Sequence, residues 1–201
     1  MRIGPKYKIA RRLGAAVFEK TQTAKYNLSL SRRERSGKMP RRPKSDFGQA
    51  LIEKQKARYT YGINERQFKG YVEKALKAPN PVNILFKLLE SRLDSVLFRS
   101  GLAKTRLAAR QIASHGHATV NGRRVTIPSL SLRIGDTVGL RGASAGSPLF
   151  AEATERMKIL TAPSWLEVSP ESLEAKVVGE PVYESGTQVF DLAVVIEFYN
   201  R

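Results

Sequence analysis

The fold of this chain is decided by residues 91–140, which read SRLDSVLFRSGLAKTRLAARQIASHGHATVNGRRVTIPSLSLRIGDTVGL. One helix is predicted to end at Gly101. Thr105 is the nearest cap-type residue for a second helix, which Gly116 would end in a left-handed conformation. Asn121-Gly122 predicts a two-residue hairpin turn, because both turn positions need positive φ. This order predicts two helices followed by a small antiparallel sheet.

Basic and polar side chains of this stretch are predicted to gather on one surface. Arg106 and Arg110 are four residues apart, so they share one face of the second helix, whereas Ile112 points elsewhere. We expect the two arginines to face solvent and to offer hydrogen-bond donors to a phosphate backbone. Alternation across the hairpin puts Ala118, Val120, Val125 and Ile127 on one side and His117, Thr119, Arg124 and Thr126 on the other. The residues that we expect to make contacts are Lys104, Arg106, Arg110, His115, His117, Arg123 and Arg124.

The charge of the chain is large, positive and unevenly distributed. The 201 residues include 35 Lys and Arg against 18 Asp and Glu, which gives a net charge of +17. Residues 1–44 hold 14 basic and two acidic residues, whereas residues 143–201 hold four basic and nine acidic ones. A chain of this kind is expected to bind a large polyanion.

Residues 91–129, SRLDSVLFRSGLAKTRLAARQIASHGHATVNGRRVTIPS, resemble the RNA-binding module named after the fourth protein of the small ribosomal subunit. SDFGQALIEKQKARYTYGINERQFKGYVEKALKA, residues 45–78, is similar to the helical segment that precedes the module in that ribosomal family. The ending, from SWLEVSPESLEAKVVGEP to VVIEFYNR, resembles the tail of the same family. The resemblance therefore covers nearly the whole chain in the right order.

The resemblance implies a structural constituent of the small ribosomal subunit that binds ribosomal RNA early, nucleates assembly of the subunit body and contributes to translational accuracy. It also implies contacts with neighbouring small-subunit proteins, including the fifth, and a place near the channel through which messenger RNA enters. We expect no membrane partner and no cofactor. A cytoplasmic ribosome is the expected location, with a plastid or another organelle as the alternative.

The first 44 residues contain turn-forming Gly4-Pro5, Ser36-Gly37 and Pro40 to Pro43, with little sustained periodicity. We expect a basic arm that is disordered in the isolated protein and orders where phosphates neutralise it. Tyr7 and Ala10 stand where many family members carry zinc-binding cysteines, so the chain resembles the cysteine-free form and no metal is expected. The RNA contacts expected in this arm are Arg11, Arg12, Arg41, Arg42 and Lys44.

The expected fold is α+β, with an N-terminal helical lobe plus an RNA-binding module of two helices and a small antiparallel sheet. Helices are predicted over residues 46–61 (with Phe47, Leu51 and Ile52 inward), over 65–77 after the cap residue Asn64, and from Pro81, with apolar positions continuing to Leu97. Strands are predicted around residues 132–140, 165–168 and 175–178, a loop over 142–148, and a helix over 151–158. The final apolar segment, 189–199, fits either helix or strand by pattern, and the resemblance favours a helix that packs back on the N-terminal helices.

The expected parts are an arm (1–44), a helical domain (45–90, with 189–200 packing back), an RNA-binding module (91–152) and a mixed extension (153–188).

Catalytic chemistry has little support in the sequence. There is no cysteine, and the two histidines, His115 and His117, do not complete a zinc site without a third ligand. Gly142-Ala143-Ser144-Ala145-Gly146 matches the nucleophile-elbow pattern in letters only, because no histidine follows it. Asp94 is expected to form a salt bridge or to lie at the surface. We therefore expect no enzyme.

Three alternatives remain at this point. A stand-alone RNA-binding protein could use the same module outside the ribosome. A pseudouridine synthase can carry the module, but it would need a catalytic domain that 201 residues do not accommodate. A DNA-binding protein could place the helix pair in a major groove, with Gln111 as a candidate base reader.

Overall fold

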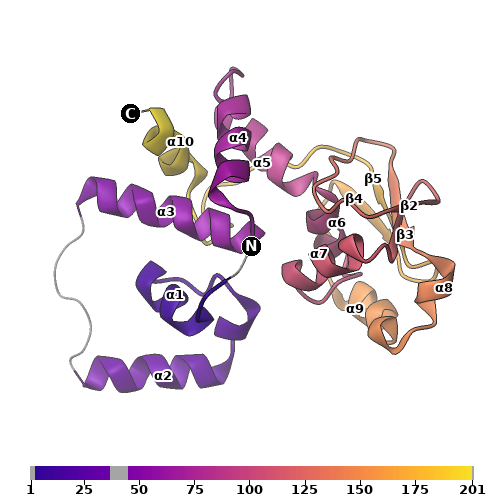
Figure 1. Cartoon of the computed structure of the whole chain (residues 1–201), viewed down its shortest axis with the longest axis horizontal. Coiled ribbons are helices and arrows are strands. Elements are labelled where there is room, and N and C mark those ends of the chain that lie inside the picture. The colour runs from indigo at the N-terminus through magenta and orange to yellow at the C-terminus, as the bar shows by residue number, and fades with distance from the viewer. Residues whose placement is uncertain (1–2, 37–44, 201) are drawn as a thin grey trace. The chain divides into compact units, whose positions relative to one another are not determined.

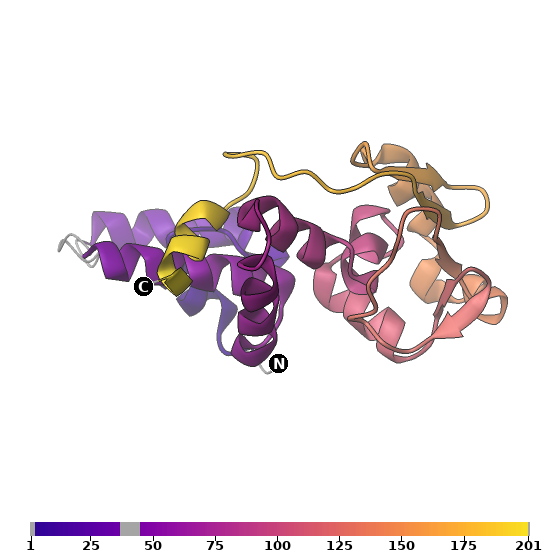
Figure 2. The ribbon, with the colours of Figure 1, turned by 90° about the horizontal axis from the view of Figure 1, so that it is seen from above.

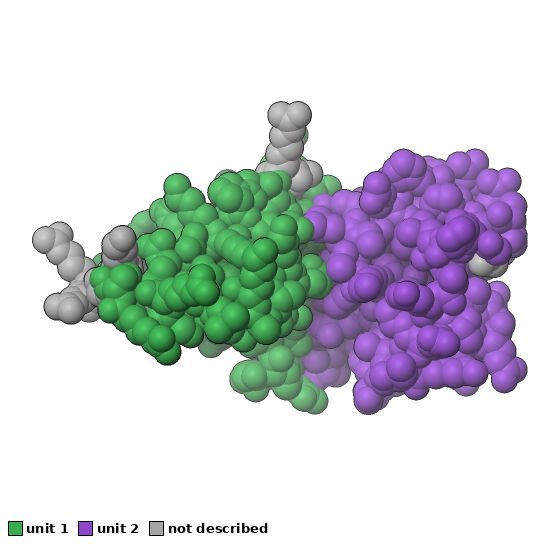
Figure 3. Space-filling view, turned by 90° about the horizontal axis from the view of Figure 1, so that it is seen from below, with its two compact units in different colours: residues 1–85, 184–201 green, residues 86–183 purple. Residues whose placement is uncertain are grey.

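The computed structural model describes residues 3–36 and 45–200. The chain forms two compact units, coloured separately in Figure 3: residues 1–85 with 184–201 make unit 1, and residues 86–183 make unit 2. The units divide the chain after residues 85 and 183, whereas the helical domain expected from the sequence extends to residue 90 and the expected extension to residue 188. Among the described residues, no helix is both long and apolar enough to cross a membrane.

The middle of unit 1 consists of helices α3 (Asp46–Tyr61) and α4 (Glu65–Ala75), as the sequence predicted (Figure 1). The Ser45 hydroxyl accepts a hydrogen bond from the Gly48 amide at the start of α3, and Gly62 ends the helix in the left-handed conformation with φ 62°. Asn64 caps α4 by accepting a hydrogen bond from the Gln67 amide at 2.8 Å. Each of these three helix ends depends on adjacent residues alone, and for that reason the two helix ranges could be predicted.

The expectation of a disordered arm is wrong for residues 3–36. They form α1 (Lys6–Leu13), a short 3₁₀ helix η1 (Glu19–Thr21) and α2 (Ala24–Arg35). Phe18 is buried, and its ring lies 5.9 Å from that of Tyr59 on α3, centroid to centroid. The sequence pattern did not predict this packing, because Gly14 interrupts the apolar pattern and Tyr59, the partner of Phe18, lies 41 residues away. The buried residues of this small core are Ala10, Leu13, Val17, Phe18 and Tyr26.

The C-terminal apolar segment is a helix, α10 (Leu192–Asn200), which packs against α3 (Figures 1 and 2). The Phe47 and Phe198 rings lie 5.4 Å apart, although Phe47 itself is 57% exposed and so does not point into the core as expected. Leu51 and Ile52 are half-buried. The Tyr199 hydroxyl donates a hydrogen bond to Glu65 Oε1 at 2.8 Å, so α10 also binds the first turn of α4.

The helix predicted to begin at Pro81 is interrupted. Helix α5 (Pro81–Glu90) ends before Ser91, and α6 (Leu93–Arg99) begins after Arg92. The Leu93 and Asp94 amides donate to the carbonyl oxygens of Leu130 and Pro128, at 2.9 and 3.1 Å. Because these amides bind a distant loop, they cannot continue the hydrogen bonds of α5. The spacing of apolar residues gives no sign of this interaction.

Unit 2 is built on the predicted helix pair and a five-stranded antiparallel sheet in the order β2-β1-β3-β5-β4. Helix α7 (Arg106–Ser114) follows α6. Asn121 and Gly122 adopt φ values of 50° and 76° at the hairpin turn, which confirms the predicted turn and the α+β class. The strands are β1 (Ala118–Val120), β2 (Arg123–Val125), β3 (Thr137–Leu140), β4 (Leu166–Ser169) and β5 (Glu174–Val177).

Three local predictions in unit 2 need correction. Ile127 and Ile134 are exposed and lie outside the named strands, because the chain turns away from the sheet after β2 and enters β3 only at Thr137. The segment predicted as a loop forms α8 (Gly142–Ala145) and a 3₁₀ helix, η2 (Pro148–Phe150), whose first turn is capped by the Ser147 hydroxyl. Helix α9 (Ala153–Ile159) follows. The core of unit 2 includes Leu93, Val96, Leu97, Ala109, Ile112, Ala118, Val138, Phe150 and Met157.

Candidate nucleic-acid interface

The predicted contact residues of unit 2 lie on α7 and the hairpin that follows it. Thr105 caps α7, since its hydroxyl accepts a hydrogen bond from the Ala108 amide at 3.0 Å. Gly116 ends the turn after α7 in the left-handed conformation with φ 73°, and the chain enters β1 directly. Both features confirm the local predictions, and they fix the hairpin to the C-terminal end of the helix.

Two buried carboxylates lie beneath α7. Glu90, on α5, is 0% exposed and binds Arg106 and Arg99, each with a 2.9 Å contact to its Oε1. Asp94, on α6, is also buried and binds Arg110 and Arg92, each with a 2.8 Å contact to its Oδ2. The expected salt bridge of Asp94 is confirmed. Each carboxylate therefore joins two arginines from different parts of the chain.

The prediction that Arg106 and Arg110 both face solvent is wrong. The Arg106 side chain is 10% exposed, donates to Ser95 Oγ at 3.0 Å, and lies over the Phe98 ring at 4.8 Å. The Arg110 side chain is 24% exposed. Helical spacing predicted correctly that the two share a face, but that face covers the buried carboxylates.

Glu90 and Arg99 are functional candidates that sequence reasoning missed. The available signal was an acidic residue inside the apolar run NILFKLLESRL, residues 83–93. A carboxylate at such a position is almost never buried unless it is paired. A buried Glu90 therefore required basic partners, and Arg99 on α6 and Arg106 on α7 are those partners.

Exposed cations flank α7: Lys104 precedes the helix, and Arg123 and Arg124 belong to the hairpin that follows it. Lys104, Arg123 and Arg124 are exposed, as is His115. The Arg124 guanidinium lies against Gly116 so closely that a Cβ there would clash with it, and its Nη2 donates to the His115 carbonyl oxygen at 3.4 Å. These side chains have the exposure that a phosphate-binding surface requires.

His117 is half-buried and occupies a different environment. Its Nδ1 lies 2.9 Å from Ser144 Oγ, and its ring meets the Phe150 ring edge-on at 5.9 Å. The His115 and His117 ring planes differ by only 13°, with centroids 6.2 Å apart. No hydrogen bond joins His117 to a carboxylate in the described part of the chain, so Ser144 and His117 do not make a catalytic triad.

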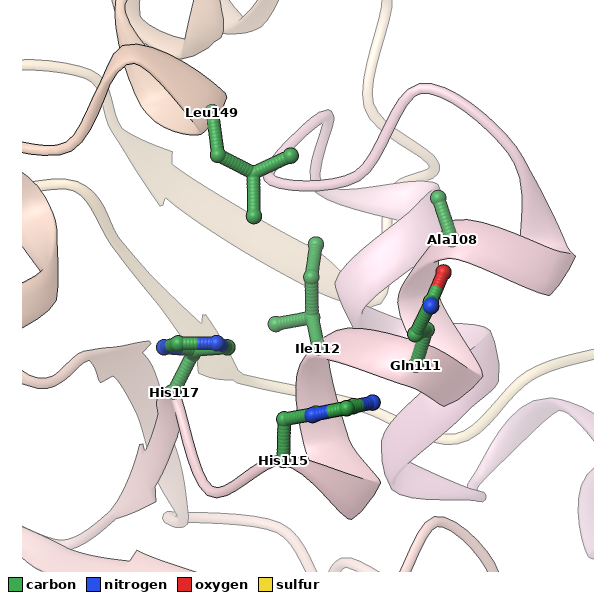
Figure 4. Close-up of a pocket in the computed structure, with 6 residues that line it drawn as sticks. All are labelled: Ala108, Gln111, Ile112, His115, His117 and Leu149. Carbon is green, nitrogen blue, oxygen red and sulfur yellow. The ribbon is translucent and has the colours of Figure 1, made fainter.

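A hollow of about 210 Å³ opens between α7 and η2 (Figure 4). Figure 4 shows Leu149 and Ile112 pointing toward each other across it, with the two histidine rings at one end. Gln111 and the histidines supply its polar atoms, and the remaining walls are apolar.

The N-terminal candidates divide between described and undescribed residues. Arg12 is exposed, whereas Arg11 is half-buried and donates from Nε to the Tyr7 carbonyl oxygen at 3.1 Å. Arg41, Arg42 and Lys44 lie outside the described residues. Within residues 3–36 and 45–200, no three His, Cys, Asp or Glu side chains are close enough to hold a metal ion.

Two family models match this chain, and between them they span residues 1–138. The model described as "Ribosomal protein S4/S9 N-terminal domain" matches residues 1–90, and the model described as "S4 domain" matches residues 91–138.

Similar proteins match over nearly the full length. A relative from Roseiflexus castenholzii is 41% identical over 202 residues, which covers 99% of this chain and 98% of the relative. Relatives from Persephonella marina and Akkermansia muciniphila are 42% and 37% identical, each covering 98% of both chains. All three are named small ribosomal subunit protein uS4.

Proposed function

This chain belongs to the ribosomal protein S4 family, and from that membership we propose that it binds small-subunit ribosomal RNA early and nucleates assembly of the subunit body. It is a structural constituent of the small ribosomal subunit, it binds ribosomal RNA, and it is not an enzyme. The family match over nearly the whole chain is the observation that carries this conclusion.

The geometry of unit 2 supports a backbone-reading mode of RNA binding. The exposed Lys104 lies just before α7, and the exposed Arg123 and Arg124 lie on the hairpin that follows the helix, where their donors can bind phosphate oxygens. RNA helices hide their base edges in a deep, narrow groove, so recognition rests mainly on phosphates, shape and 2′-hydroxyl groups. We therefore assign the RNA contacts of the S4 domain to these exposed side chains, with His115 beside them.

The buried ion pairs have a second role in this proposal. Glu90 and Asp94 hold Arg106 and Arg110 in fixed positions under the binding surface. A surface that is ordered before RNA arrives loses less conformational entropy on binding. Arg106 and Arg110 thus act mainly by holding α7 in place, and Arg110 retains a partly exposed edge that RNA can reach.

The finer partners follow from the family resemblance. We propose a contact with the fifth small-subunit protein, a position near the channel through which messenger RNA enters, and a contribution to translational accuracy. The proposed location is the cytoplasmic ribosome, and a plastid or other organelle is the alternative. Tagged protein followed by organelle fractionation distinguishes these locations.

The test is co-sedimentation of the full-length protein with small ribosomal subunits after a high-salt wash. We expect the protein to stay with the subunit and to bind free small-subunit ribosomal RNA in preference to duplex DNA of equal length. Binding to free RNA without retention on the subunit would instead support a stand-alone RNA-binding protein. Equal competition by duplex DNA would contradict RNA recognition altogether.

Nucleation has its own test, which is the order of addition during reconstitution of the subunit from its RNA and proteins. Omitting this protein at the start and adding it last is expected to leave incomplete particles. Complete particles under both orders would contradict the nucleating role while leaving RNA binding intact.

A further inference from the structure

The side-chain amide of Asn121 is fixed at both ends, although the residue is exposed to water. Its Nδ2 donates a hydrogen bond to Asp136 Oδ1 at 2.8 Å, and its Oδ1 accepts one from the Thr137 amide at 2.9 Å. Both partners lie at the start of β3, so the amide group points across to that strand and ties the hairpin turn to it.

The residue that follows makes this asparagine chemically labile. Asn121 precedes Gly122, whereas the other asparagines of the sequence precede larger residues; these are Asn27, Asn64, Asn80, Asn83 and Asn200. Glycine has no Cβ, so its backbone nitrogen can approach the side-chain amide carbon of the preceding asparagine without steric hindrance. Asparagine before glycine is therefore the pair in a protein chain that most readily loses its side-chain amide to water.

The reaction needs water and no other reagent. The Gly122 backbone nitrogen bonds to Cγ of Asn121, the bond from Cγ to Nδ2 breaks, and Nδ2 leaves as ammonia with the proton that the backbone nitrogen gives up. Water then opens the five-membered imide at one of its two carbonyl groups. Opening at Cγ gives aspartate, and opening at the main-chain carbonyl gives isoaspartate. Nothing is oxidised or reduced.

The folded hairpin opposes this reaction in two ways. The amide must turn from β3 toward the Gly122 nitrogen, which breaks its hydrogen bonds with both Asp136 and Thr137. The backbone is also held in the turn, with φ values of 50° and 76° at residues 121 and 122. An open hairpin has neither restraint.

The products do not fit the closed hairpin. A carboxylate at position 121 has no donor for Asp136, and two like charges then repel each other where a donor had faced an acceptor. Isoaspartate also adds a carbon atom to the main chain inside a two-residue turn. Arg123 and Arg124 directly follow that turn, so their positions change with it.

We propose that Asn121 is a deamidation site whose reaction is controlled by the fold. While Asp136 and Thr137 hold its amide, the residue stays asparagine. When the hairpin opens, water converts it to aspartate or isoaspartate, and the hairpin no longer closes as before. A chain that has stayed open thus carries a permanent chemical change. This inference does not depend on the proposed function.

The first experiment follows the reaction in the full-length protein at mildly alkaline pH, in native buffer and in urea. An isoaspartyl methyltransferase labels isoaspartate, and peptide mass spectrometry locates the modified residue. We expect Asn121 to deamidate over days in urea and to persist in native buffer. An asparagine that persists in urea would show that position 121 is no such site. Equal rates in both solutions would show that the fold does not control the reaction.

The second experiment removes the acceptor with Asp136→Ala. A hydrogen bond to a charged group changes an opening equilibrium by about tenfold or more, so Asn121 should be lost about tenfold faster in native buffer. Ile112→Ala is the control, because it lowers stability from a buried position on α7. Both variants are incubated well below their melting temperatures, and in urea both should react at the wild-type rate. Equal native rates for the two variants would overturn the inference, because protection would then reflect overall stability alone.

The third experiment reproduces the aspartate product with Asn121→Asp. This variant should melt at a lower temperature than the wild type, because two carboxylates then face each other. Adding Asp136→Asn exchanges the donor and the acceptor, so the double variant should regain most of the lost melting temperature. Asp136→Asn alone completes the double-mutant cycle. A double variant no more stable than Asn121→Asp, or an Asn121→Asp protein as stable as the wild type, would show that the product does not disrupt the hairpin and would overturn the inference.

Discussion

Arg110 donates two hydrogen bonds to Oδ2 of Asp94, from Nε at 3.1 Å and from Nη2 at 2.8 Å. The same carboxylate binds Arg92, which lies two residues before it. Asp94 thus ties α7 to the start of α6, and Glu90 does the same for α7 and α5 through Arg106. An arginine predicted to contact RNA is therefore first of all a structural residue.

Replacing Arg106 with alanine should destabilise the protein. The change leaves Glu90 buried with one partner fewer, and removing one member of a buried ion pair costs about 3–5 kcal/mol. Urea unfolding measures the destabilisation. Lys104→Ala is the matched control, since Lys104 is exposed and such substitutions usually change stability by less than about 0.5 kcal/mol. Equal stability of the two variants would show that the Glu90 pair contributes nothing.

Local features of this chain were predictable and long-range ones were not. The Asn121-Gly122 turn and the caps at Asn64 and Thr105 depend on a few adjacent residues, and all three are confirmed. The break between α5 and α6 depends instead on carbonyl groups of Pro128 and Leu130, more than 30 residues away. No spacing rule contains that information.

The same limit applies to the candidate site. Spacing placed Arg106 and Arg110 on one face but could not say whether that face meets solvent or buried carboxylates. In the N-terminal region, the high charge led to a prediction of disorder, but Phe18 packs against Tyr59 on α3 and the region is ordered there. In both cases a tertiary contact decides the outcome, and it overrides what local sequence propensity predicts.

Replacing Phe18 with alanine tests the packing of the N-terminal helices. Phe18 is 2% exposed, and truncating a buried phenylalanine costs roughly 3–5 kcal/mol. Phe47→Ala is the control, because Phe47 is mostly exposed and its truncation should cost much less. Thermal unfolding of both variants provides the comparison. If Phe18→Ala unfolds like the wild type, residues 3–36 do not belong to the core of unit 1.

Two glycines should respond to alanine in opposite directions. Gly116 has φ 73°, in the left-handed region that L side chains rarely adopt, so Gly116→Ala should destabilise by about 1–2 kcal/mol. Gly70 lies inside α4 with open space around it, so Gly70→Ala should stabilise by about 0.5–1 kcal/mol. Chemical denaturation of both variants gives the signs. A stabilising effect at Gly116 would contradict the described turn.

The contacts of Glu65 predict a dependence of stability on pH. Burial alone would raise the pKa of Glu65, but hydrogen bonds from Lys54 and Tyr199 and the charges of Lys54 and Arg58 outweigh it and lower the pKa. A carboxyl group whose pKa is lowered by folding adds stability above its unfolded pKa, about 4.3, and that stability disappears as pH falls through the folded pKa. Glu65→Gln should therefore lower the melting temperature at pH 7 and have a smaller effect near pH 3.

The control for Glu65 is Glu73→Gln, since Glu73 is exposed and pairs with Lys69 at the surface. Surface pairs of this kind contribute about 0–1 kcal/mol, so its effect should be small at both pH values. A constant melting difference between wild type and Glu65→Gln across the acidic range would show that the carboxylate charge does not contribute.

The exposed cations of the S4 domain should affect RNA binding and leave stability unchanged. Lys104→Gln with Arg123→Gln removes two exposed charges, for which no ion pair is found among the described residues. If both side chains bind phosphates, the slope of log K against log salt should fall by about 0.7–0.9 for each phosphate that is no longer neutralised. The melting temperature of this double variant should match that of the wild type.

Ile112→Ala is the opposite control, because Ile112 is buried and its truncation should cost roughly 2–5 kcal/mol of stability. The affinity of the folded Ile112→Ala protein should stay close to that of the wild type. If Lys104→Gln with Arg123→Gln binds ribosomal RNA as tightly as the wild type at every salt concentration, RNA lies on another face of the S4 domain.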